Sequence, residues 1–428
     1  MIEETVPVSN PPPMVIERTQ PRAPYAAGVR GPLHILFIVE NSTVPPDVRV
    51  WREARFARAR GFRVSVIAPR TADHPREHET IEGIDIYRHP VCERGSGKWA
   101  QLAEYGSALA HEAWLSLKVF RRHPFQIFHG ANPPDHVFMI ALLFRMLGVR
   151  FVFDHHDLAP ELYLSKYGGR KNIFYHGLRL MERLSCRTAH AVVSTNRSYK
   201  RHVVAAHGID PGKVFIVRND PEATQEPTLV APRTDAAHTR LLYLGSINTQ
   251  DGVDLLVRSL HLLAYELGER DFRCDIIGDG DALERVRALS AELGMDRYLQ
   301  FPGFVQSKKA VLAHIRSADI CLESAPLNEL NAKSTFIKVM EYMSQAKPVV
   351  AFDLPETRFS TAGAAVLVPP NDVCAFARAV QALMHDPARR AELGRLGRQR
   401  IVNELNWGRS AGSLSRTYAS LLQPGSEP

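Results

Sequence analysis

The chain has 428 residues, of which 45% are hydrophobic and 23% charged, and this is the composition of a soluble globular protein. That length is too great for one ordinary hydrophobic core, so we expect two domains of about 150 to 200 residues each. Lysine and arginine are spread along the chain, and the net charge of +7 is modest for its length. These features favour an anionic small ligand or an anionic membrane surface, and they argue against a dedicated nucleic-acid binder.

The beginning of the chain does not have the pattern of an export signal. Residues 1–31 are rich in proline and lack an apolar core, so we expect them to form a disordered arm. No stretch approaches the roughly eighteen apolar residues that a membrane span requires. The five cysteines lie far apart and form no Cys-x-x-Cys motif, which is typical of a reducing compartment. We therefore expect a cytoplasmic protein.

In the first half of the chain, short β-rich runs alternate with helical patterns. The runs are HILFIVE, RVSVIAP, IDIYRH, IFHG, RFVFDHH, HAVVSTN and VFIVRN. Such alternation predicts βαβ units around a parallel sheet, and we place this first Rossmann-like domain in residues 32–220. Residues 221–239, which are polar and rich in proline, are expected to be a linker.

A second series of runs follows, and it predicts a second Rossmann-like domain in residues 240–405. The runs are RLLYLG, RCDIIG, LQFPGF, ADICLE, PVVAFD and AAVLVPP. The first helix between them has an apolar stripe at helical spacing, made of Val253, Leu256, Val257, Leu260, Leu263, Ala264 and Leu267. Residues 406–423 are expected to form a helix that packs back on the first domain. Two such doubly wound α/β domains would hold ligands in a cleft at the carboxyl ends of their strands.

One helix of the second domain carries charges inside an otherwise apolar run, NAKSTFIKVMEYMSQAKPVVAFDLPETR. Ser334 and Thr335 are good N-cap residues, so we expect the helix to begin there and to end near Gln345, with an anion site at its start. Ser334, Lys338 and Glu341 stand at i, i+4 and i+7 and therefore form one polar stripe. Because an unpaired buried ion is costly, this stripe faces water, a ligand or a partner charge. The simplest alternative is an ion pair between Lys338 and Glu341.

In this context, after the run ADICLESAPL and before PVVAFD, the sequence resembles glycosyltransferases of the GT-B fold, in particular the large retaining family numbered four. The match is closest over KVMEYMSQAKPVVAFDLPETR. Glu341 then corresponds to the second glutamate of the family's Glu-x7-Glu motif, which hydrogen-bonds the ribose of the donor nucleotide. The chain has Lys333 where the first glutamate belongs. The resemblance implies an acceptor-binding first domain and a second domain that binds a nucleotide-diphosphate sugar.

The resemblance also concerns the donor diphosphate. Where the family has two basic residues, the stretch YLGSINTQDGVD has Ser246 and Asp251. A subgroup that builds surface polysaccharides is similar to this chain, with a neutral loop and a Lys-x-x-Glu-Tyr-Met helix, and there Lys338 and the helix N-terminus would supply the missing positive charge. The residues that we assign to the donor are Gly245, Ser246, Gly278, Asp279, Gly280, Ser334, Thr335, Lys338 and Glu341.

A metal role is considered at two places. The turn IIGDGDALERV is by itself a weak nucleotide signal, and its Asp279 and Asp281 spell the Asp-x-Asp metal motif of another glycosyltransferase fold. We discount that motif because GT-B chemistry requires no metal. In FVFDHHDLAPELY, His155 and His156 are adjacent on a strand and point to opposite faces, so at most one of them can serve a given site. We expect neither a metal nor another cofactor.

The remaining candidates lie in the first domain. His129 ends an apolar strand, and the resemblance implies a catalytic position near the transferred sugar beside Lys338 and Glu341; the alternative is a histidine that is hydrogen-bonded to a neighbouring loop. We assign the acceptor side to Asp47, Arg49, His156, Asp157 and Glu161. A salt bridge between Asp47 and Arg49 is the alternative for that pair.

The resemblance implies a hexosyltransferase that moves a sugar from a nucleotide-diphosphate sugar to a glycan or lipid-linked glycan in surface polysaccharide synthesis, with retention. A nucleotide-sugar 2-epimerase on the same fold and an inactive scaffold protein are the alternatives. The stretch WAQLAEYGSALAHEAWLSLKVFRRHPF is either a core helix or a peripheral contact with the inner face of the plasma membrane.

Overall fold

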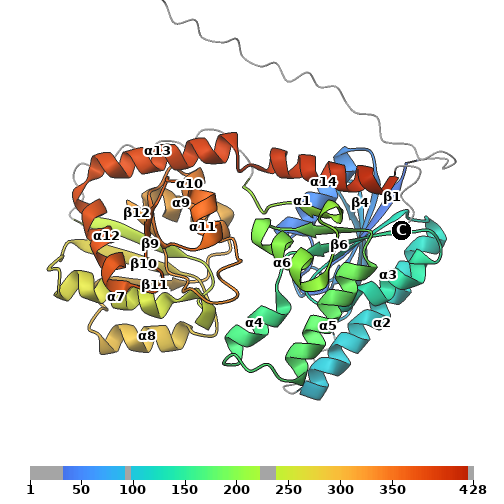
Figure 1. Cartoon of the computed structure of the whole chain (residues 1–428), viewed down its shortest axis with the longest axis horizontal. Coiled ribbons are helices and arrows are strands. Elements are labelled where there is room, and N and C mark those ends of the chain that lie inside the picture. The colour runs from blue at the N-terminus through green and yellow to red at the C-terminus, as the bar shows by residue number, and fades with distance from the viewer. Residues whose placement is uncertain (1–31, 92–97, 222–237, 423–428) are drawn as a thin grey trace, which may run out of the picture.

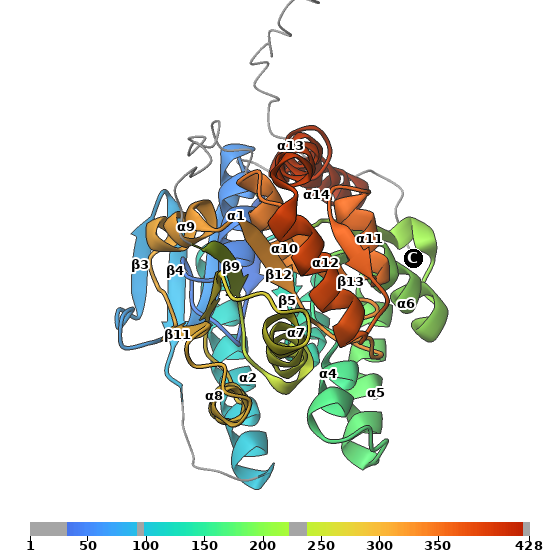
Figure 2. The same ribbon diagram turned by 90° about the vertical axis from the view of Figure 1, so that its left-hand side faces the viewer.

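The computed structural model describes residues 32–91, 98–221 and 238–422, and for 98–103 it gives the backbone only. The expected N-terminal arm and nearly all of the expected linker lie outside these residues. Figure 1 shows two α/β units side by side, with the helices α13 (Pro387–Asn403) and α14 (Trp407–Leu422) running end to end along one edge of both. Figure 2, viewed from the side of the second unit, shows the same two helices at the top of the molecule.

The first domain is built on an eight-stranded sheet with the order β3-β4-β2-β1-β5-β6-β7-β8, in which only β3 is antiparallel to its neighbour. The strands are β1 (His34–Ile38), β2 (Arg63–Pro69), β3 (His78–Ile81), β4 (Ile84–His89), β5 (Ile127–Ala131), β6 (Arg150–His155), β7 (Ala191–Ser194) and β8 (Val214–Ile216). The central strands are nearly continuous apolar runs because helices cover both faces of a parallel sheet.

The helices of the first domain divide between the two faces of this sheet. They are α1 (Val48–Ala59), α2 (Lys98–Arg122), α3 (Phe138–Arg145), α4 (Ala159–Lys166), α5 (Ile173–Thr188) and α6 (Arg197–His207), with short 3-10 turns at Asp135–Val137 and Pro211–Lys213. On one face α1 packs with α14 (Trp407–Leu422), which brings Leu414, Tyr418 and Leu421 into the core. On the other face α2, α3, α5 and α6 contribute the buried apolar residues.

The second domain has a six-stranded, wholly parallel sheet with the order β11-β10-β9-β12-β13-β14. The strands are β9 (Thr239–Leu244), β10 (Phe272–Ile277), β11 (Leu299–Gly303), β12 (Ile320–Glu323), β13 (Val349–Phe352) and β14 (Val366–Val368). The helices are α7 (Val253–Tyr265), α8 (Leu283–Glu292), α9 (Lys308–Ser317), α10 (Ile337–Ser344), α11 (Pro355–Thr361), α12 (Val373–His385) and α13 (Pro387–Asn403), with a 3-10 turn η3 at Thr249–Asp251. The apolar stripe predicted for α7 is buried in the core of this domain, apart from the half-buried Leu267.

The helix α10 is held in place by the close approach of α13. A Cβ atom built on Gly394 of α13 would lie 2.0 Å from the backbone oxygen of Ala346, and one built on Gly397 would lie 3.0 Å from the side chain of Met343. The two glycines therefore allow α13 to pack against the carboxyl end of α10 at backbone distance. This contact fixes where the side chains of α10 stand relative to the sheet.

We predict opposite effects for two glycine-to-alanine changes on neighbouring helices. Gly394→Ala should destabilise the protein by about 1–3 kcal/mol, since the new methyl group overlaps backbone that cannot move aside. Gly412→Ala on α14 meets nothing closer than 3.9 Å and should stabilise it by about 0.5–1 kcal/mol, because alanine is the better helix former. Urea unfolding curves with equal slopes would measure both, and a harmless Gly394→Ala would contradict the packing argument.

Candidate active site

Lys338 lies at the carboxyl end of the second sheet and is paired there with a buried carboxylate. Its Nζ is 3.0 Å from Oε2 of Glu323, the last residue of β12, and it donates a hydrogen bond of 2.8 Å to the hydroxyl of Tyr243 on β9. The ammonium also lies over the Tyr243 ring, 4.2 Å from its centroid. The Lys338 side chain keeps 11% exposure, so it can still meet a ligand. The alternative of an ion pair between Lys338 and Glu341 is not what the structure shows.

Glu323 depends on this lysine for its charge. The carboxylate is buried, and burial raises its pKa, while Lys338 and the amide of Ala325 lower it. Gly245 makes the arrangement possible, because a Cβ atom there would lie 2.7 Å from Cε of Lys338. The ammonium therefore lies directly beside the backbone that follows β9.

Glu341 stands about one helical turn after Lys338 and keeps part of its surface exposed. Burial raises the pKa of its carboxyl, and Lys308 and Lys338 lower it. Among the residues that the structure describes, we find no hydrogen bond or ion pair to its carboxylate. A carboxylate in this state can accept hydrogen bonds from a ligand's hydroxyl groups.

The start of α10 differs from the sequence prediction. The helix begins at Ile337, and its N-cap residue is Phe336, which provides no side-chain hydrogen bond. Ser334 Oγ donates instead to the carbonyl of Leu330, and Thr335 Oγ1 accepts a hydrogen bond from Asn196 of the first domain. The prediction that Ser334 and Thr335 cap this helix is therefore wrong, because their hydroxyls take part in the loop and in the contact between the domains.

The glycine-rich turns at the ends of β9 and β10 pack directly on one another. A Cβ atom on Gly278, whose φ is +152°, would lie 1.8 Å from the oxygen of Gly245, and one on Gly280 would lie 2.5 Å from the oxygen of Ile247. The side chain of Ser246 is exposed, as is that of Asp279, whose carboxylate accepts from the amide of Gly280. These residues thus line the predicted donor side, and close packing explains the glycines.

The two aspartates of the Asp-x-Asp pair each accept a backbone hydrogen bond. Asp281 accepts a hydrogen bond from the amide of Thr249, as Asp279 does from Gly280. Neither aspartate belongs to a group of converging metal-binding side chains within the described part of the chain.

Lys333 reaches across to the first domain. Its Nζ lies 2.8 Å from Oε1 of Glu161 on α4, and its carbonyl accepts a hydrogen bond of 2.8 Å from Asn196. Leu330 packs beside this pair against Leu158 and Tyr199 of the first domain. A glutamate at position 333 would face the carboxylate of Glu161, whereas the lysine pairs with it. Glu161, predicted to contact the acceptor, is therefore part of the contact between the domains.

A second contact between the domains has no counterpart among the sequence predictions. Glu356 of α11 accepts a hydrogen bond of 3.0 Å from the amide of Ser198 and lies 3.4 Å from the guanidinium of Arg218. Glu356 is buried. No local pattern around Glu356 indicates a partner so far away in the sequence.

His129 does not line the site as predicted. It is 1% exposed and lies under the helices α1 and α14, with Nδ1 at 2.9 Å from the hydroxyl of Tyr418 and Nε2 at 3.4 Å from Glu53. Its ring stacks on Phe37. Burial lowers the pKa of His129 to about 4, so the imidazole is neutral. We therefore correct its assignment from a catalytic residue to a buried structural one.

Arg49 and Asp47 are structural as well. Arg49 forms a bidentate ion pair with Asp154, with contacts of 2.6 and 2.8 Å, and both residues are buried. Burial alone would raise the pKa of Asp154. The effects of Arg49 and His156 are larger, so the pKa of Asp154 is lowered. Asp47 does not pair with Arg49; it caps α1 by accepting from the amide of Val50. Their assignment to the acceptor side is thus not supported by their contacts.

The two adjacent histidines point to opposite faces, as predicted. His155 lies 2.8 Å from Glu182, whereas His156 lies 3.4 Å from Asp154. Asn132 accepts hydrogen bonds from the amides of His156 and Asp157 and donates to the carbonyl of Asp157. His156 and Asp157 thus lie on a loop at the carboxyl end of β6 that the Asn132 side chain stabilises, and both side chains keep some exposure.

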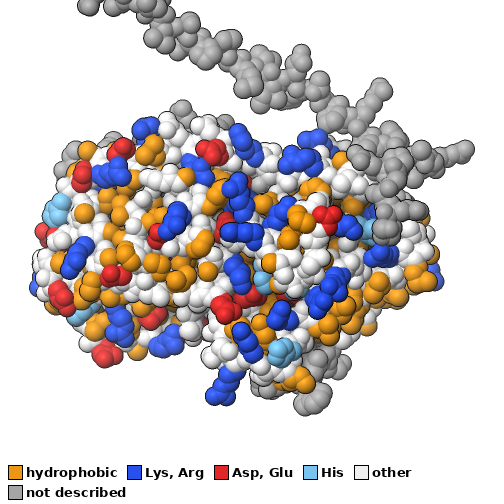
Figure 3. Space-filling model, viewed as in Figure 1, with side chains coloured by type: hydrophobic (Ala, Val, Ile, Leu, Met, Phe, Trp, Pro, Cys, Tyr) orange, Lys and Arg blue, Asp and Glu red, His pale blue; other side chains and the backbone are white. Residues whose placement is uncertain are grey.

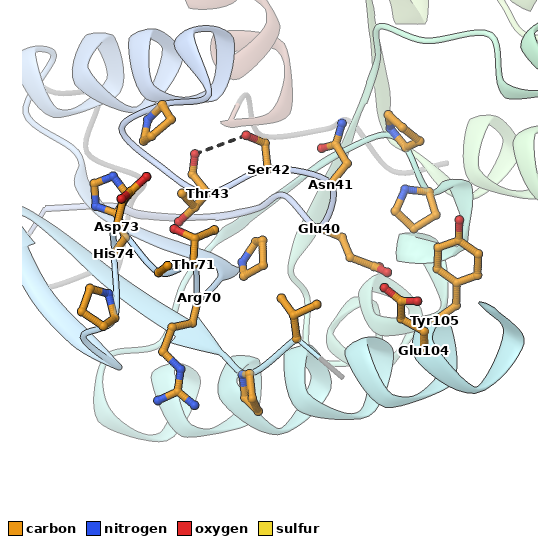
Figure 4. Close-up of a pocket in the computed structure, with 18 residues that line it drawn as sticks. Glu40, Asn41, Ser42, Thr43, Arg70, Thr71, Asp73, His74, Glu104 and Tyr105 are labelled. Carbon is orange, nitrogen blue, oxygen red and sulfur yellow. Dashed lines mark hydrogen bonds between the residues drawn. The ribbon is translucent and has the colours of Figure 1, made fainter. Parts of the chain in front are cut away.

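The carboxyl ends of β1, β2, β4 and β5 surround a cavity of about 1140 Å³. Figure 4 shows Glu40 and Glu104 pointing toward each other beside Tyr105, while Thr43 and Thr71 line another part of the wall. The polar residues of this wall are Glu40, Asn41, Ser42, Thr43, Arg70, Thr71, Asp73, His74, Glu104 and Tyr105. The one local signal is the polar stretch VENST directly after β1.

The comparisons with known proteins agree with this architecture. Residues 46–220 match the family model of the glycosyl transferase 4-like domain, and residues 238–386 match that of the glycosyl transferases of group 1. The chain belongs to the GT-B glycosyltransferases.

Two curated relatives are similar to parts of this glycosyltransferase. A D-inositol 3-phosphate glycosyltransferase from Kineococcus radiotolerans is 27% identical over 266 residues, which are 55% of this chain and 58% of that protein. An alpha-maltose-1-phosphate synthase from Mycolicibacterium smegmatis is 26% identical over 298 residues, 64% of this chain and 73% of that protein. The chain thus spans less than two thirds of the length of the first of these relatives.

Solved structures confirm the predicted fold class. The sucrose-phosphate synthase of Thermosynechococcus elongatus superposes with a TM-score of 0.75 at 16% identity, over 91% of this chain and 99% of that one. The Anabaena protein HepE, solved with UDP-glucose, superposes with a TM-score of 0.68 at 13% identity, over 91% and 100%. At these identities the likeness shows the GT-B fold alone.

We predict that Arg49→Met destabilises the protein by about 3–5 kcal/mol, because it leaves the charge of Asp154 buried without its partner. The matched control is Arg55→Met on the same helix, which removes an exposed pair with Glu82 and should cost less than about 1 kcal/mol. Chemical denaturation of both variants would measure the difference. Equal effects would show that the Asp154 charge is compensated in another way.

Proposed function

We propose that this glycosyltransferase moves a hexose from a nucleotide-diphosphate sugar to a glycan or lipid-linked glycan acceptor in surface polysaccharide synthesis, with retention of configuration. The observation that carries the proposal is the pair of side chains on α10. Lys338 offers a fixed positive charge beside Gly245, and Glu341, about one turn further along, is a carboxylate without a partner among the described residues. A nucleotide diphosphate needs these two chemistries, one for the phosphates and one for the ribose.

The chemical step follows from the charges that develop during transfer. Cleavage of the bond between the sugar and the phosphate leaves a diphosphate anion and an electron-deficient sugar carbon. A preorganised cation at the leaving group lowers the barrier most when water is excluded. Lys338 supplies that cation, Glu341 binds the ribose hydroxyls, and the acceptor hydroxyl attacks from the same face and passes its proton to the departing phosphate. In this proposal no metal is required.

The nucleotides bound in similar solved structures support the class of donor. The Anabaena protein HepE was solved with UDP and with UDP-glucose. We therefore take a nucleoside diphosphate as the recognition element, with UDP as the first to test.

For the acceptor we propose the cavity at the carboxyl end of the first sheet. Its wall carries the carboxylates of Glu40, Asp73 and Glu104, against one guanidinium from Arg70. Carboxylates accept hydrogen bonds from sugar hydroxyls and repel phosphate groups. The cavity therefore suits a neutral glycan better than a phosphorylated acceptor.

A face of the first domain suits the peripheral membrane contact that a lipid-linked acceptor requires. Exposed apolar side chains gather on and just after α3 and on the second half of α2, at Trp114, Leu117, Met139, Leu142, Leu143, Met146 and Leu147. Basic residues of α2 and α3 accompany them, at Lys118, Arg121, Arg122 and Arg145. Figure 3 shows orange and blue side chains together over this part of the molecule. Apolar insertion combined with positive charge is the pattern of helices that lie on anionic bilayers. Among the described helices, none is both long and apolar enough to cross a membrane.

We predict that Lys338→Met and Glu341→Gln each weaken nucleotide-diphosphate binding by about 10- to 100-fold, the worth of a charge-assisted hydrogen bond. Calorimetry with UDP, GDP and dTDP would measure this, and turnover of the matching sugar should fall in parallel. Lys309→Met, a change at an exposed lysine of α9, is the matched control and should bind as the wild type does.

A double variant and an incubation without acceptor complete this test. Glu323→Gln combined with Lys338→Met removes both members of the buried pair, so it separates lost binding from lost stability. Donor incubated without acceptor should give at most slow hydrolysis; conversion to an epimeric sugar would instead identify an epimerase. Wild-type affinity in the Lys338 and Glu341 variants would refute the assigned donor site.

We predict that Met146→Glu and Leu143→Glu reduce flotation with vesicles that contain anionic phospholipid by at least about 10-fold, because each places a charge where apolar side chains would enter the bilayer. Met146 is 89% exposed, so its substitution should leave the fold intact. Phe304→Glu, at a 70% exposed position of the second domain, is the control. Binding that is unchanged in the Met146 and Leu143 variants would exclude this face.

A further inference from the structure

Four side chains of the first domain converge on one buried point that is not part of the cavity proposed for the acceptor. Glu182 comes from α5, His202 and His207 from α6, and His155 from the end of β6. The Glu182 carboxylate lies 2.8 Å from His155 Nε2, 3.3 Å from His202 Nε2 and 3.0 Å from His207 Nε2. Donor atoms of Glu182, His202 and His207 all lie within 4.8 Å of one another.

Oε1 of Glu182 shares hydrogen bonds with His155 Nε2 and, at 3.3 Å, with His202 Nε2, which would give up that bond to ligate a metal ion. The other hydrogen bonds of this cluster are incomplete. His207 is 2% exposed, and neither of its ring nitrogens makes a hydrogen bond. Oε2 of Glu182 is also buried without a hydrogen bond, although His207 Nε2 is 3.0 Å away. An imidazole and a carboxylate that face each other at this distance without hydrogen-bond geometry suit ligation of a common cation, because each directs a lone pair toward it.

The charges around the cluster also favour a bound cation. Glu182 is 1% exposed, and within the described ranges its ion-pair partners are histidines, with no lysine or arginine among them. The buried carboxyl of Asp135 lies near enough to influence its neighbours His155 and Glu182, and Lys333 is already paired with Glu161. A buried carboxylate surrounded by imidazoles requires either a proton or a metal ion to balance its charge.

We propose that Glu182, His202 and His207 bind one Zn²⁺ ion, with Oε2 of Glu182 and Nε2 of each histidine as ligands. Imidazole and carboxylate are among the common ligands of zinc, and three of them with one position left to solvent is a known arrangement. His155 donates to the other oxygen of Glu182 and so orients it. His202 keeps 13% exposure, which provides an entry path for the ion.

The proposed ion has a structural consequence for the contact between the domains. His202 Nδ1 lies 3.6 Å from Oε1 of Glu161, the oxygen that holds Lys333 of the second domain. A ligating histidine commonly donates its other ring N–H to a carboxylate, which fixes its orientation. Zinc bound at Nε2 would thus stiffen the Glu161 side of this contact. The ion would serve structure and not the transfer step.

The test is zinc binding by tag-free protein, because an affinity tag of histidines would itself bind the ion. We expect the purified chain to retain about one Zn²⁺ per molecule after gel filtration, measured by elemental analysis. We also expect its apparent unfolding temperature to rise by roughly 5 °C at saturating zinc and to fall again with EDTA. Mg²⁺ should have neither effect.

Variants locate the ion. His202→Gln and His207→Gln should each lower zinc affinity by at least about 10-fold. His176→Gln, at an exposed histidine of α5, should leave it unchanged. Lys338→Met should also retain zinc, so loss of the donor site and loss of the metal site are distinguishable. Zinc that is absent from the wild type, or held equally by the His202 and His207 variants, would overturn the proposal.

A spectroscopic measurement covers the case in which a variant fails to fold. Co²⁺ added to the wild type should give the intense visible bands of low-coordinate cobalt with nitrogen and oxygen ligands, and Zn²⁺ should abolish them. The absence of such bands would count against the site, whatever the variants do.

Discussion

The ion pair between Lys338 and Glu323 is the interaction on which the proposed donor site depends. Glu323 ends a central strand, so its position is fixed by the sheet, and burial makes its charge costly unless a cation lies beside it. Lys338 provides that cation from α10, and the position of α10 is in turn set by the backbone contact with α13 at Gly394. Removing one partner of such a buried pair typically costs about 3–5 kcal/mol, so the ammonium is held firmly where a ligand meets it.

The second constraint is the contact between the domains. It is polar and specific: Lys333 pairs with Glu161, Asn196 bridges to the chain before α10, and Glu356 caps the start of α6. On the second domain's side, Lys333 lies just before α10, and Glu356 lies on α11, which packs beside α10. Lys333, just before α10, therefore connects the position of the proposed donor site to the arrangement of the two domains. This contact also places α4 of the first domain close to η3 of the second.

Several charged and titratable side chains of the first domain are buried in its interior. Arg49 keeps the buried carboxylate of Asp154 ionised, because it lowers the pKa that burial would raise. Burial of Glu53 acts in the opposite direction and raises its pKa to about 8, which makes a neutral Glu53 beside the neutral His129 the favoured state. Asp154 also lies 3.4 Å from His156 and so helps to hold the loop after β6.

Local sequence determined the parts of this protein that depend on periodicity: the alternation of strands and helices, the apolar stripe of α7, and the opposite directions of His155 and His156. It also singled out Lys338 and Glu341, because two charges on an apolar helix require a partner whatever the fold. Tertiary structure alone decided which partner each charge meets. Glu161 and Tyr418 lie 172 and 289 residues along the chain from Lys333 and His129. Glu323 is nearer to Lys338 in the sequence, but it ends a strand and Lys338 stands on a helix, so no helical or strand period relates the two. Period-two alternation shows that a strand has two faces, but helices cover both faces of this sheet, and the period does not tell what packs over each residue. The family resemblance placed His129 beside the transferred sugar, and the tertiary packing buries it beneath α1 and α14.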